Sequence, residues 1–126
     1  MTTLPRMCLP RSSAVLAAFA AIGLAVALPA QAKTKSCNVQ DDSTKYGASY
    51  ITSLKVTNVT CARGKEIVRA YHKCRHAHGG RKGRCPTKVL GGACRDQRTQ
   101  IATQINGKAT CTKGHARVVH TYTEFI

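Results

Sequence analysis

The hydrophobic and polar positions follow two different periods between residues 50 and 78. From residue 51 to residue 59, apolar and β-branched side chains are mixed with threonines, a pattern that predicts a β-strand despite its imperfect alternation. Across residues 62–77 the apolar positions recur at helical spacing. These positions are Ile67, Val68, Tyr71 and Cys74. Thr60 can cap the helix with its hydroxyl, whereas Gly64 weakens the first turn.

The second half of the chain predicts a cationic loop and then several antiparallel strands. Asn106-Gly107 is a strong hairpin signal, because both central residues of a tight hairpin turn must accept positive φ. Lys113-Gly114 indicates a second turn. The expected order is a loop at 79–84, a strand at 87–94 with a glycine break at 91–92, a turn at 95–98, and strands at 99–105, 108–112 and 116–125.

These elements predict an α+β fold in which one helix packs on a three- to four-stranded antiparallel sheet. We expect residues 50–126 to form a single disulfide-bridged domain. Residues 33–49 are polar and rich in Asp, Ser and Gly, so they are expected to form an irregular arm that Cys37 tethers to the domain.

The first 32 residues have the features of a cleaved signal peptide. Arg6 and Arg11 precede an uncharged apolar run over residues 14–28, and Ala30-Gln31-Ala32 has the small-x-small form that signal peptidases cut. The run is shorter than the roughly 20 residues that a bilayer core requires, which argues against a membrane anchor. Cys8 precedes the run, so it is not placed like the cysteine of a lipoprotein. We therefore expect a secreted protein with no membrane span after cleavage.

The cysteines indicate a disulfide framework. Of the seven cysteines, only Cys8 leaves with the signal peptide, and an even set in a short exported chain implies bridges. No C-x-x-C pair is present, which argues against zinc. Spacing alone leaves the pairing open, but one pair closes a short loop and another lies on strands expected to be neighbours. The pairs that we expect are Cys37–Cys61, Cys74–Cys85 and Cys94–Cys111.

The charge balance predicts an anionic partner. Of the 20 Lys and Arg, two leave with the signal peptide, which lowers the formal charge from +15 to +13. Aromatic residues are few and do not interleave with the basic ones, so the composition argues against specific nucleic-acid recognition. Positive charge is densest at the helix end and in the following loop. The residues expected to bind the partner are Lys73, Arg75, Arg81, Lys82 and Arg84.

The histidines are the best candidates for chemistry. His72 and His76 have the i, i+4 spacing that places two imidazoles on one helix face, and His78 follows closely. The surrounding cations and the lack of a nearby carboxylate argue against a metal, so neither a metal nor a cofactor is expected. A small ribonuclease-like enzyme is an alternative, because paired imidazoles suit proton transfer. The residues for that chemistry would be His72, Lys73, His115 and His120.

Several short motifs are similar to those of a known group. Residues 56–63 read V-T-N-V-T-C-A-R, residues 89–94 read V-L-G-G-A-C, and residues 111–114 read C-T-K-G. Together they resemble small secreted actinobacterial proteins that carry a six-cysteine domain with a V-x-C-x-x-A-like helix start and a C-x-x-G turn. The chain departs from that pattern at Gly92, where the group usually has an aromatic residue, and at Gly64, where an alanine could sit. The resemblance implies architecture and export. The group has no established activity, so the resemblance implies no catalytic residues.

The hypothesis from the sequence is a non-catalytic exported binding module. It would associate with an anionic cell-envelope polymer, or with another secreted protein, through the loop at 79–84 and the exposed helix face. A secreted hydrolase inhibitor is an alternative, in which the loop closed by Cys74 and Cys85 would enter the enzyme.

Overall fold

The computed structural model describes residues 23, 25 and 32–126. The expected signal peptide lies almost entirely outside these residues, so its cleavage stays a prediction. Within the described part, no helix has the length and apolar character needed to cross a membrane.

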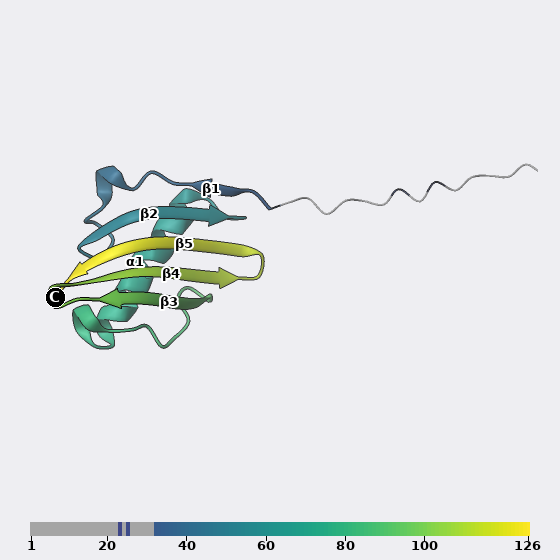
Figure 1. Cartoon of the computed structure of the whole chain (residues 1–126). Coiled ribbons are helices and arrows are strands. Elements are labelled where there is room, and N and C mark those ends of the chain that lie inside the picture. Colours follow the sequence, from purple (N-terminus) through teal and green to yellow (C-terminus); the bar gives the residue numbers. More distant parts are fainter. Residues whose placement is uncertain (1–22, 24, 26–31) are drawn as a thin grey trace, which may run out of the picture.

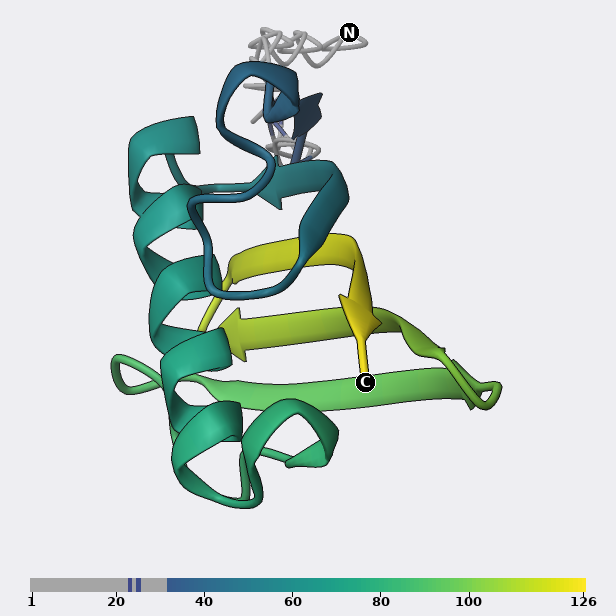
Figure 2. The same ribbon diagram turned by 90° about the vertical axis from the view of Figure 1, so that its left-hand side faces the viewer.

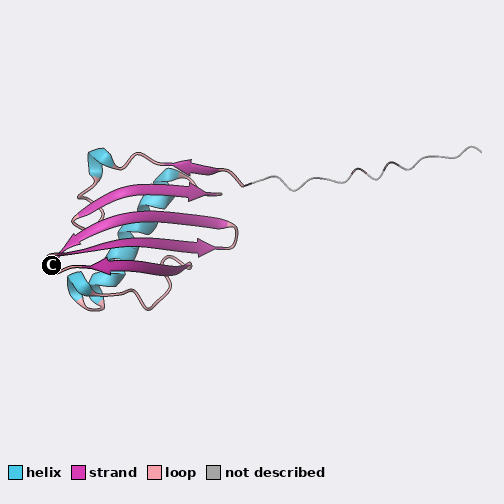
Figure 3. Ribbon diagram, in the orientation of Figure 1, coloured by secondary structure: helices cyan, strands magenta, loops and turns pink. Residues whose placement is uncertain are grey.

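One helix lies against one face of a five-stranded sheet (Figures 1 and 3). The strands are β1 (Thr34–Ser36), β2 (Tyr50–Thr57), β3 (Ala93–Gln100), β4 (Gln104–Lys113) and β5 (Ala116–Phe125); the helix is α1 (Cys61–Ala77), and the short 3-10 helices are η1 (Gln40–Asp42) and η2 (Gly80–Lys82). The sheet order is β1-β2-β5-β4-β3, and all neighbouring strands are antiparallel. The predicted α+β class is confirmed, and the sheet has more strands than the sequence analysis expected.

Helix α1 begins where its capping residue predicts. The Thr60 hydroxyl accepts a hydrogen bond from the Arg63 backbone N–H at 3.1 Å. Gly64, which weakens the first turn, allows the helix to approach β2 closely. A Cβ atom at Gly64 would lie 2.6 Å from Val56 Cγ1. The helical cost of this glycine is therefore offset by closer packing of the helix on the sheet.

The prediction of a hairpin turn at Asn106-Gly107 is wrong. Strand β4 runs through both residues, and the turn between β3 and β4 lies at residues 101–103. Gly107 faces the core, where a Cβ atom would lie 2.3 Å from the Tyr122 ring. This glycine therefore makes room for an aromatic side chain of the neighbouring strand. Residues 95–98, expected to form a turn, belong to β3.

The prediction of a strand over residues 87–94 is also wrong for most of these residues. Val89 and Gly92 pair across a tight turn whose central residues, Leu90 and Gly91, have φ of 48° and 81°. Strand β3 begins only at Ala93. The glycine break is thus a turn that leads into the strand.

Residues 33–49 are less irregular than expected. They contain β1, which pairs with β2, and η1. Four of their side chains are buried in the hydrophobic core: Cys37, Val39, Tyr46 and Ala48. This segment is part of the domain because it covers one end of the core.

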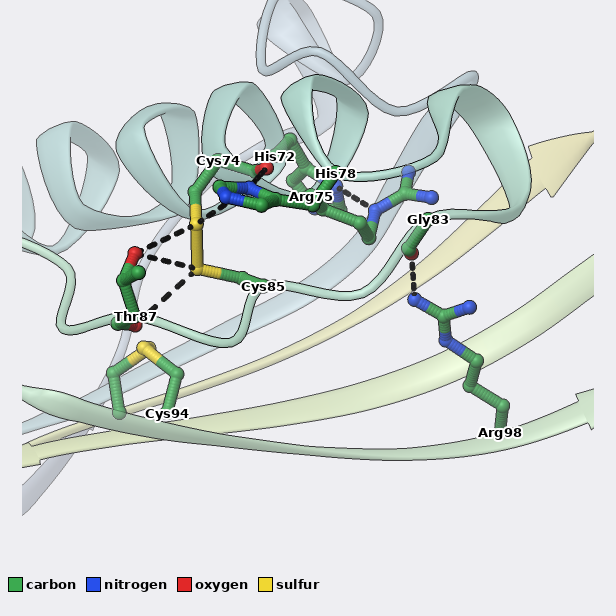
Figure 4. Close-up of a disulfide and its surroundings, with 10 residues drawn as sticks. His72, Cys74, Arg75, His78, Gly83, Cys85, Thr87, Cys94 and Arg98 are labelled. Atoms are coloured by element: carbon green, nitrogen blue, oxygen red, sulfur yellow. Dashed lines mark hydrogen bonds between the residues drawn. A yellow bond between two sulfur atoms is a disulfide. The ribbon is translucent and has the colours of Figure 1, made fainter.

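Three disulfides join the same cysteines that the sequence analysis pairs. Cys37–Cys61 connects the segment before β2 to the start of α1, and Cys94–Cys111 connects β3 to β4. Cys74–Cys85 connects the helix to the loop that follows it (Figure 4). The bridges thereby link α1, β3 and β4 covalently to neighbouring segments in a chain too short to bury a large core, whereas β5 is held by strand pairing and packing alone.

We predict that Gly107→Ala destabilises the protein by about 1–3 kcal/mol, because the added methyl group overpacks against the Tyr122 ring. Urea unfolding with the disulfides intact measures the change. Thr112→Ala is the control, since Thr112 lies on the same strand but is exposed, and it should cost no more than about 0.5 kcal/mol. Equal stability of the Gly107→Ala variant and the wild type would contradict this account of the register.

Candidate functional site

A buried ion pair lies between the end of α1 and the end of β5. Arg75 is fully buried, and its guanidinium donates to a carboxylate oxygen of Glu124, which is 2% exposed. The same guanidinium donates to the backbone carbonyl of Arg81, and His76 Nε2 lies 3.0 Å from Glu124 Oε2. Arg75 is therefore not available to a partner. The prediction that it binds an anion at the surface is wrong, because Glu124 already neutralises it inside the protein.

Two histidines meet beside this ion pair. Arg75 Nε donates to His72 Nδ1 at 3.1 Å, so the proton of a neutral His72 sits on Nε2. His72 Nε2 lies 3.0 Å from His120 Nε2, which must then accept the bond. The proton of His120 is left on Nδ1, a buried atom with no hydrogen-bond partner in the described part of the chain. This chain of bonds requires both imidazoles to be neutral.

The environment lowers the pKa of both histidines. Burial lowers the pKa of His120 to about 4; the Asp96 carboxylate opposes this shift, and Arg75 adds to it. Burial, His120 and Arg75 together hold the pKa of His72 far below its usual range. A proton added to either ring would break a hydrogen bond and place a second charge beside the guanidinium.

This histidine pair is not accessible to a substrate. His72 and His120 have 0% exposure, whereas the acid and base of a ribonuclease must reach a phosphodiester. His115 is exposed at the turn between β4 and β5, and His78 donates to the carbonyl of Cys74 at the helix end. Among the described residues, no group of three or more His, Cys, Asp or Glu is placed to hold a metal ion.

Of the cations expected to bind an anionic partner at the helix end and in the loop at 79–84, only some are free to contact it. Lys73 and Lys82 are exposed. The other two cationic side chains are exposed but bond to the protein itself, Arg81 to the carbonyl of Phe125 at 3.0 Å and Arg84 to that of Asp96 at 3.2 Å.

The loop backbone is also held inward. The Arg98 side chain donates to the carbonyls of Lys82 and Gly83, as Figure 4 shows for Gly83. The loop thus presents side chains to solvent, while the carbonyls of three successive residues, Arg81 to Gly83, face the protein.

A second carboxylate is neutralised within the protein. Asp96 accepts hydrogen bonds from Arg98 and from the Tyr122 hydroxyl, and its side chain is 7% exposed. Burial and the nearby Asp96 carboxylate raise the pKa of Tyr122, so the phenol stays protonated and donates this bond. Asp96 and Glu124 therefore show almost no negative charge at the surface.

The opposite face of the sheet is open. Figure 1 looks onto this face with α1 behind it, and in Figure 2 no described element covers the side of the sheet opposite α1. The strands alternate buried and outward positions. We call the outward side of β2–β5 the open face. Its residues include Lys55, Thr57, Arg95, Gln97, Asn106, Lys108, Thr110, Thr112, Arg117, Val119, Thr121 and Thr123.

The open face is hollowed, and its charged outward-facing side chains are all cationic. A hollow of about 740 Å³ is lined by Arg95, Lys108 and Arg117 together with Gln97, Thr110 and Thr112. Asp96 also borders this hollow, but its carboxylate is bonded to Arg98 and Tyr122. No outward-facing residue of the described strands β2–β5 is acidic. An anion that approaches this face therefore meets cations and neutral hydroxyl or amide groups.

The helix side carries cations too, but carboxylates lie among them. Arg63 pairs with Glu66 at 2.7 Å, and Lys45 pairs with Asp42 at 2.9 Å. Lys45 lowers the pKa of Asp42 most, and Lys65 and Arg69 add to the effect, so the Asp42 carboxylate lies near these helix cations. The helix side thus has mixed charge, unlike the open face.

Comparisons with protein-family models, with curated proteins and with solved structures find no significant match. The resemblance to actinobacterial six-cysteine proteins therefore stays a prediction.

The open face was not among the sites predicted from the sequence. Alternation within residues 116–125 places Arg117 on the side opposite Val118, His120 and Tyr122, a signal that was available. Arg95 was missed because residues 95–98 were assigned to a turn, although they belong to β3. Lys108 was placed on a strand, but the wrong hairpin at Asn106-Gly107 separated it from its true partner, Gln97 on β3.

We predict that Glu124→Gln lowers the free energy of unfolding by about 3–5 kcal/mol, because it leaves the buried Arg75 guanidinium uncompensated. Guanidinium chloride unfolding measures the loss. Glu66→Gln removes the exposed partner of Arg63 and should cost at most about 1 kcal/mol. Similar losses for the two variants would show that the buried pair has no special role.

We also predict that acid destabilises the fold. An unfolded histidine titrates near 6.5, above the folded pKa of about 4 for His120, so the unfolded chain binds more protons as the pH falls. Stability is full above about pH 6.5 and falls toward pH 4, by on the order of 3 kcal/mol from His120. Urea unfolding at pH 7.5 and pH 4.5 tests this.

Two variants identify the source of the pH dependence. His120→Gln should reduce it, because the amide oxygen can accept from His72 without titrating. His115→Gln removes an exposed histidine and should leave the dependence unchanged. An undiminished pH dependence in His120→Gln would contradict the assignment.

Proposed function

We propose that this chain is an exported, non-catalytic module that binds an anionic polymer across the open face of its sheet. The observation that carries the proposal is the hollow lined by Arg95, Lys108 and Arg117 on a face whose outward strand residues include no carboxylate. This site differs from the loop and helix face that the sequence analysis favoured.

The arrangement of the cations suits an extended partner better than a small ion. Lys55, Arg95, Lys108 and Arg117 come from four different strands, so they are spread over the face and do not converge on one point. A linear polyanion can contact several of them and release counterions from each contact, which a single small anion cannot do. The threonine and amide side chains between them can donate hydrogen bonds to the oxygens of such a polymer.

A rigid sheet favours this mode of binding. The cations stand on paired strands, and the Cys94–Cys111 disulfide fixes β3 against β4. Side chains on an ordered backbone lose less freedom on binding than those of a flexible loop. The sheet therefore offers a preorganised array of charges.

The proposed location is outside the cytoplasm. A small protein with three disulfides is consistent with an extracellular location. The apolar leader with its small-x-small site supports export by secretion. An anionic polymer of the cell envelope is the partner class that such a protein would meet first.

The other two hypotheses lack a comparable observation. For the ribonuclease-like alternative, the two histidines that meet are buried. For the inhibitor alternative, the carbonyls of Arg81, Lys82 and Gly83 are bonded inward, so this part of the loop backbone is not free to pair with an enzyme. Neither arrangement favours the corresponding function.

We predict that Lys108→Gln/Arg117→Gln weakens binding to long-chain polyphosphate about tenfold or more in low salt. The slope of log affinity against log salt should fall by about 2, since two phosphate contacts are lost. Fluorescence anisotropy with a labelled polymer measures both quantities. The charge-matched control, Lys73→Gln/Lys82→Gln, removes two exposed cations outside the open face and should change the affinity by less than about threefold. An equal or larger loss in the control would place binding at the loop instead.

A further inference from the structure

Two aromatic side chains stand together at one end of the open face. Tyr50 on β2 and Phe125 on β5 are each 43% exposed, and their ring centroids lie 5.5 Å apart in an edge-to-face arrangement. The other exposed large hydrophobic residues of the described part, Leu90 and Ile101, lie in turns. An exposed aromatic pair on a sheet is a common feature of binding surfaces, because large rings lose apolar contact with water when a ligand covers them.

The pair is continuous with the cationic hollow. Tyr50 lies opposite Thr123, which lies opposite Asn106 on the next strand. Thr123 and Asn106 line a second hollow of about 440 Å³, and this hollow shares Gln97 and Lys108 with the cationic one. The open face thus changes along its length from cations to hydroxyl and amide groups and then to aromatic rings.

Hydrogen bonds hold the backbone of Phe125 in place. The Phe125 backbone N–H donates to Ser49 Oγ at 3.0 Å, and its carbonyl accepts from Arg81 at 3.0 Å. The Ser49 hydroxyl in turn donates to Glu124 Oε1 at 3.2 Å. These contacts fix the backbone that carries the ring. A preorganised exposed ring costs little entropy when a ligand binds.

From this arrangement we propose that the anionic polymer is an acidic glycopolymer, and that the Tyr50–Phe125 pair contacts a sugar ring of it. One side of a sugar ring presents weakly positive C–H groups, which are attracted to the negative face of an aromatic ring. The hydroxyl groups at the ring edge match Thr123, Asn106 and their neighbours, and the acidic groups match the cations. This inference rests on the proposed function, since it names the chemical class of the polymer bound by the open face.

A nucleic acid fits this surface less well. Non-specific strand binding needs aromatic rings interleaved with cations so that successive bases stack beside their phosphates. On the open face the rings are gathered at one end, and their mutual edge-to-face contact does not form a parallel platform for two bases.

The test compares two polymers on the full mature chain with its disulfides intact. Polygalacturonate carries sugar rings and carboxylates, and long-chain polyphosphate carries charge alone. We expect Tyr50→Ala/Phe125→Ala to weaken polygalacturonate binding about tenfold and to change polyphosphate binding by less than about twofold. Leu90→Ala/Ile101→Ala, which removes two exposed apolar side chains elsewhere, should affect neither probe. Lys108→Gln/Arg117→Gln should weaken both.

A milder variant and an optical signal show whether a loss of binding comes from misfolding. Phe125→Leu keeps an apolar side chain but removes the ring, and it should also weaken polygalacturonate selectively. The chain has no Trp and four Tyr, so tyrosine fluorescence can report contact. Polygalacturonate should change the emission of the wild type, and Tyr50→Phe should remove most of that change.

The outcomes separate the two proposals. If the wild type binds both polymers and the aromatic variants weaken both equally or neither, the glycopolymer inference is overturned and the polyanion function stands. Tighter, ring-dependent binding of poly(dT) than of polygalacturonate would also overturn the inference. If neither polymer binds at low salt, the proposed function and the inference both fail.

Discussion

The buried pair of Arg75 and Glu124 determines how the last strand is oriented. It joins the final turn of α1 to β5, and through the Arg81 carbonyl it also holds the following loop. Because side chains alternate along a strand, burying Glu124 directs its neighbours, Thr123 and Phe125, to the opposite side. A shift of one residue would move the carboxylate into solvent and leave the guanidinium unpaired in the core, at high cost. The composition of the open face therefore follows from an interaction on the other side of the sheet.

The distribution of the acids matters as much as the excess of bases. The chain has only five acids. Asp96 and Glu124 are buried against arginines, and Asp42 and Glu66 form ion pairs away from the open face. A highly basic composition gives a weak, unspecific attraction when charges of both signs are mixed. Here, placing the carboxylates elsewhere concentrates the positive potential on one surface.

The sequence predicted those elements whose signals are local. Helix α1 follows from its apolar spacing and from Thr60, and β5 follows from its alternation. The β3–β4 register is set instead by contacts between distant residues. A two-residue turn at Asn106-Gly107 would place Cys111 opposite Ala102, whereas the observed register pairs it with Cys94. Gly107 leaves room for the Tyr122 ring of the neighbouring strand. The contact between His72 and His120 depends on how α1 crosses the sheet, which no local sequence pattern encodes.

Strand β3 forms one edge of the sheet, and edges of this kind can recruit a strand from another molecule. The carbonyl of Asp96 on this strand is already bonded by Arg84, whose neighbour Cys85 is anchored to α1 by a disulfide. The loop is thus fastened along the border of the sheet, where it competes with intermolecular pairing. Arg84, a residue expected to capture a partner, therefore occupies a backbone acceptor that an incoming strand would need, and the Cys74–Cys85 bridge anchors the loop that holds it there.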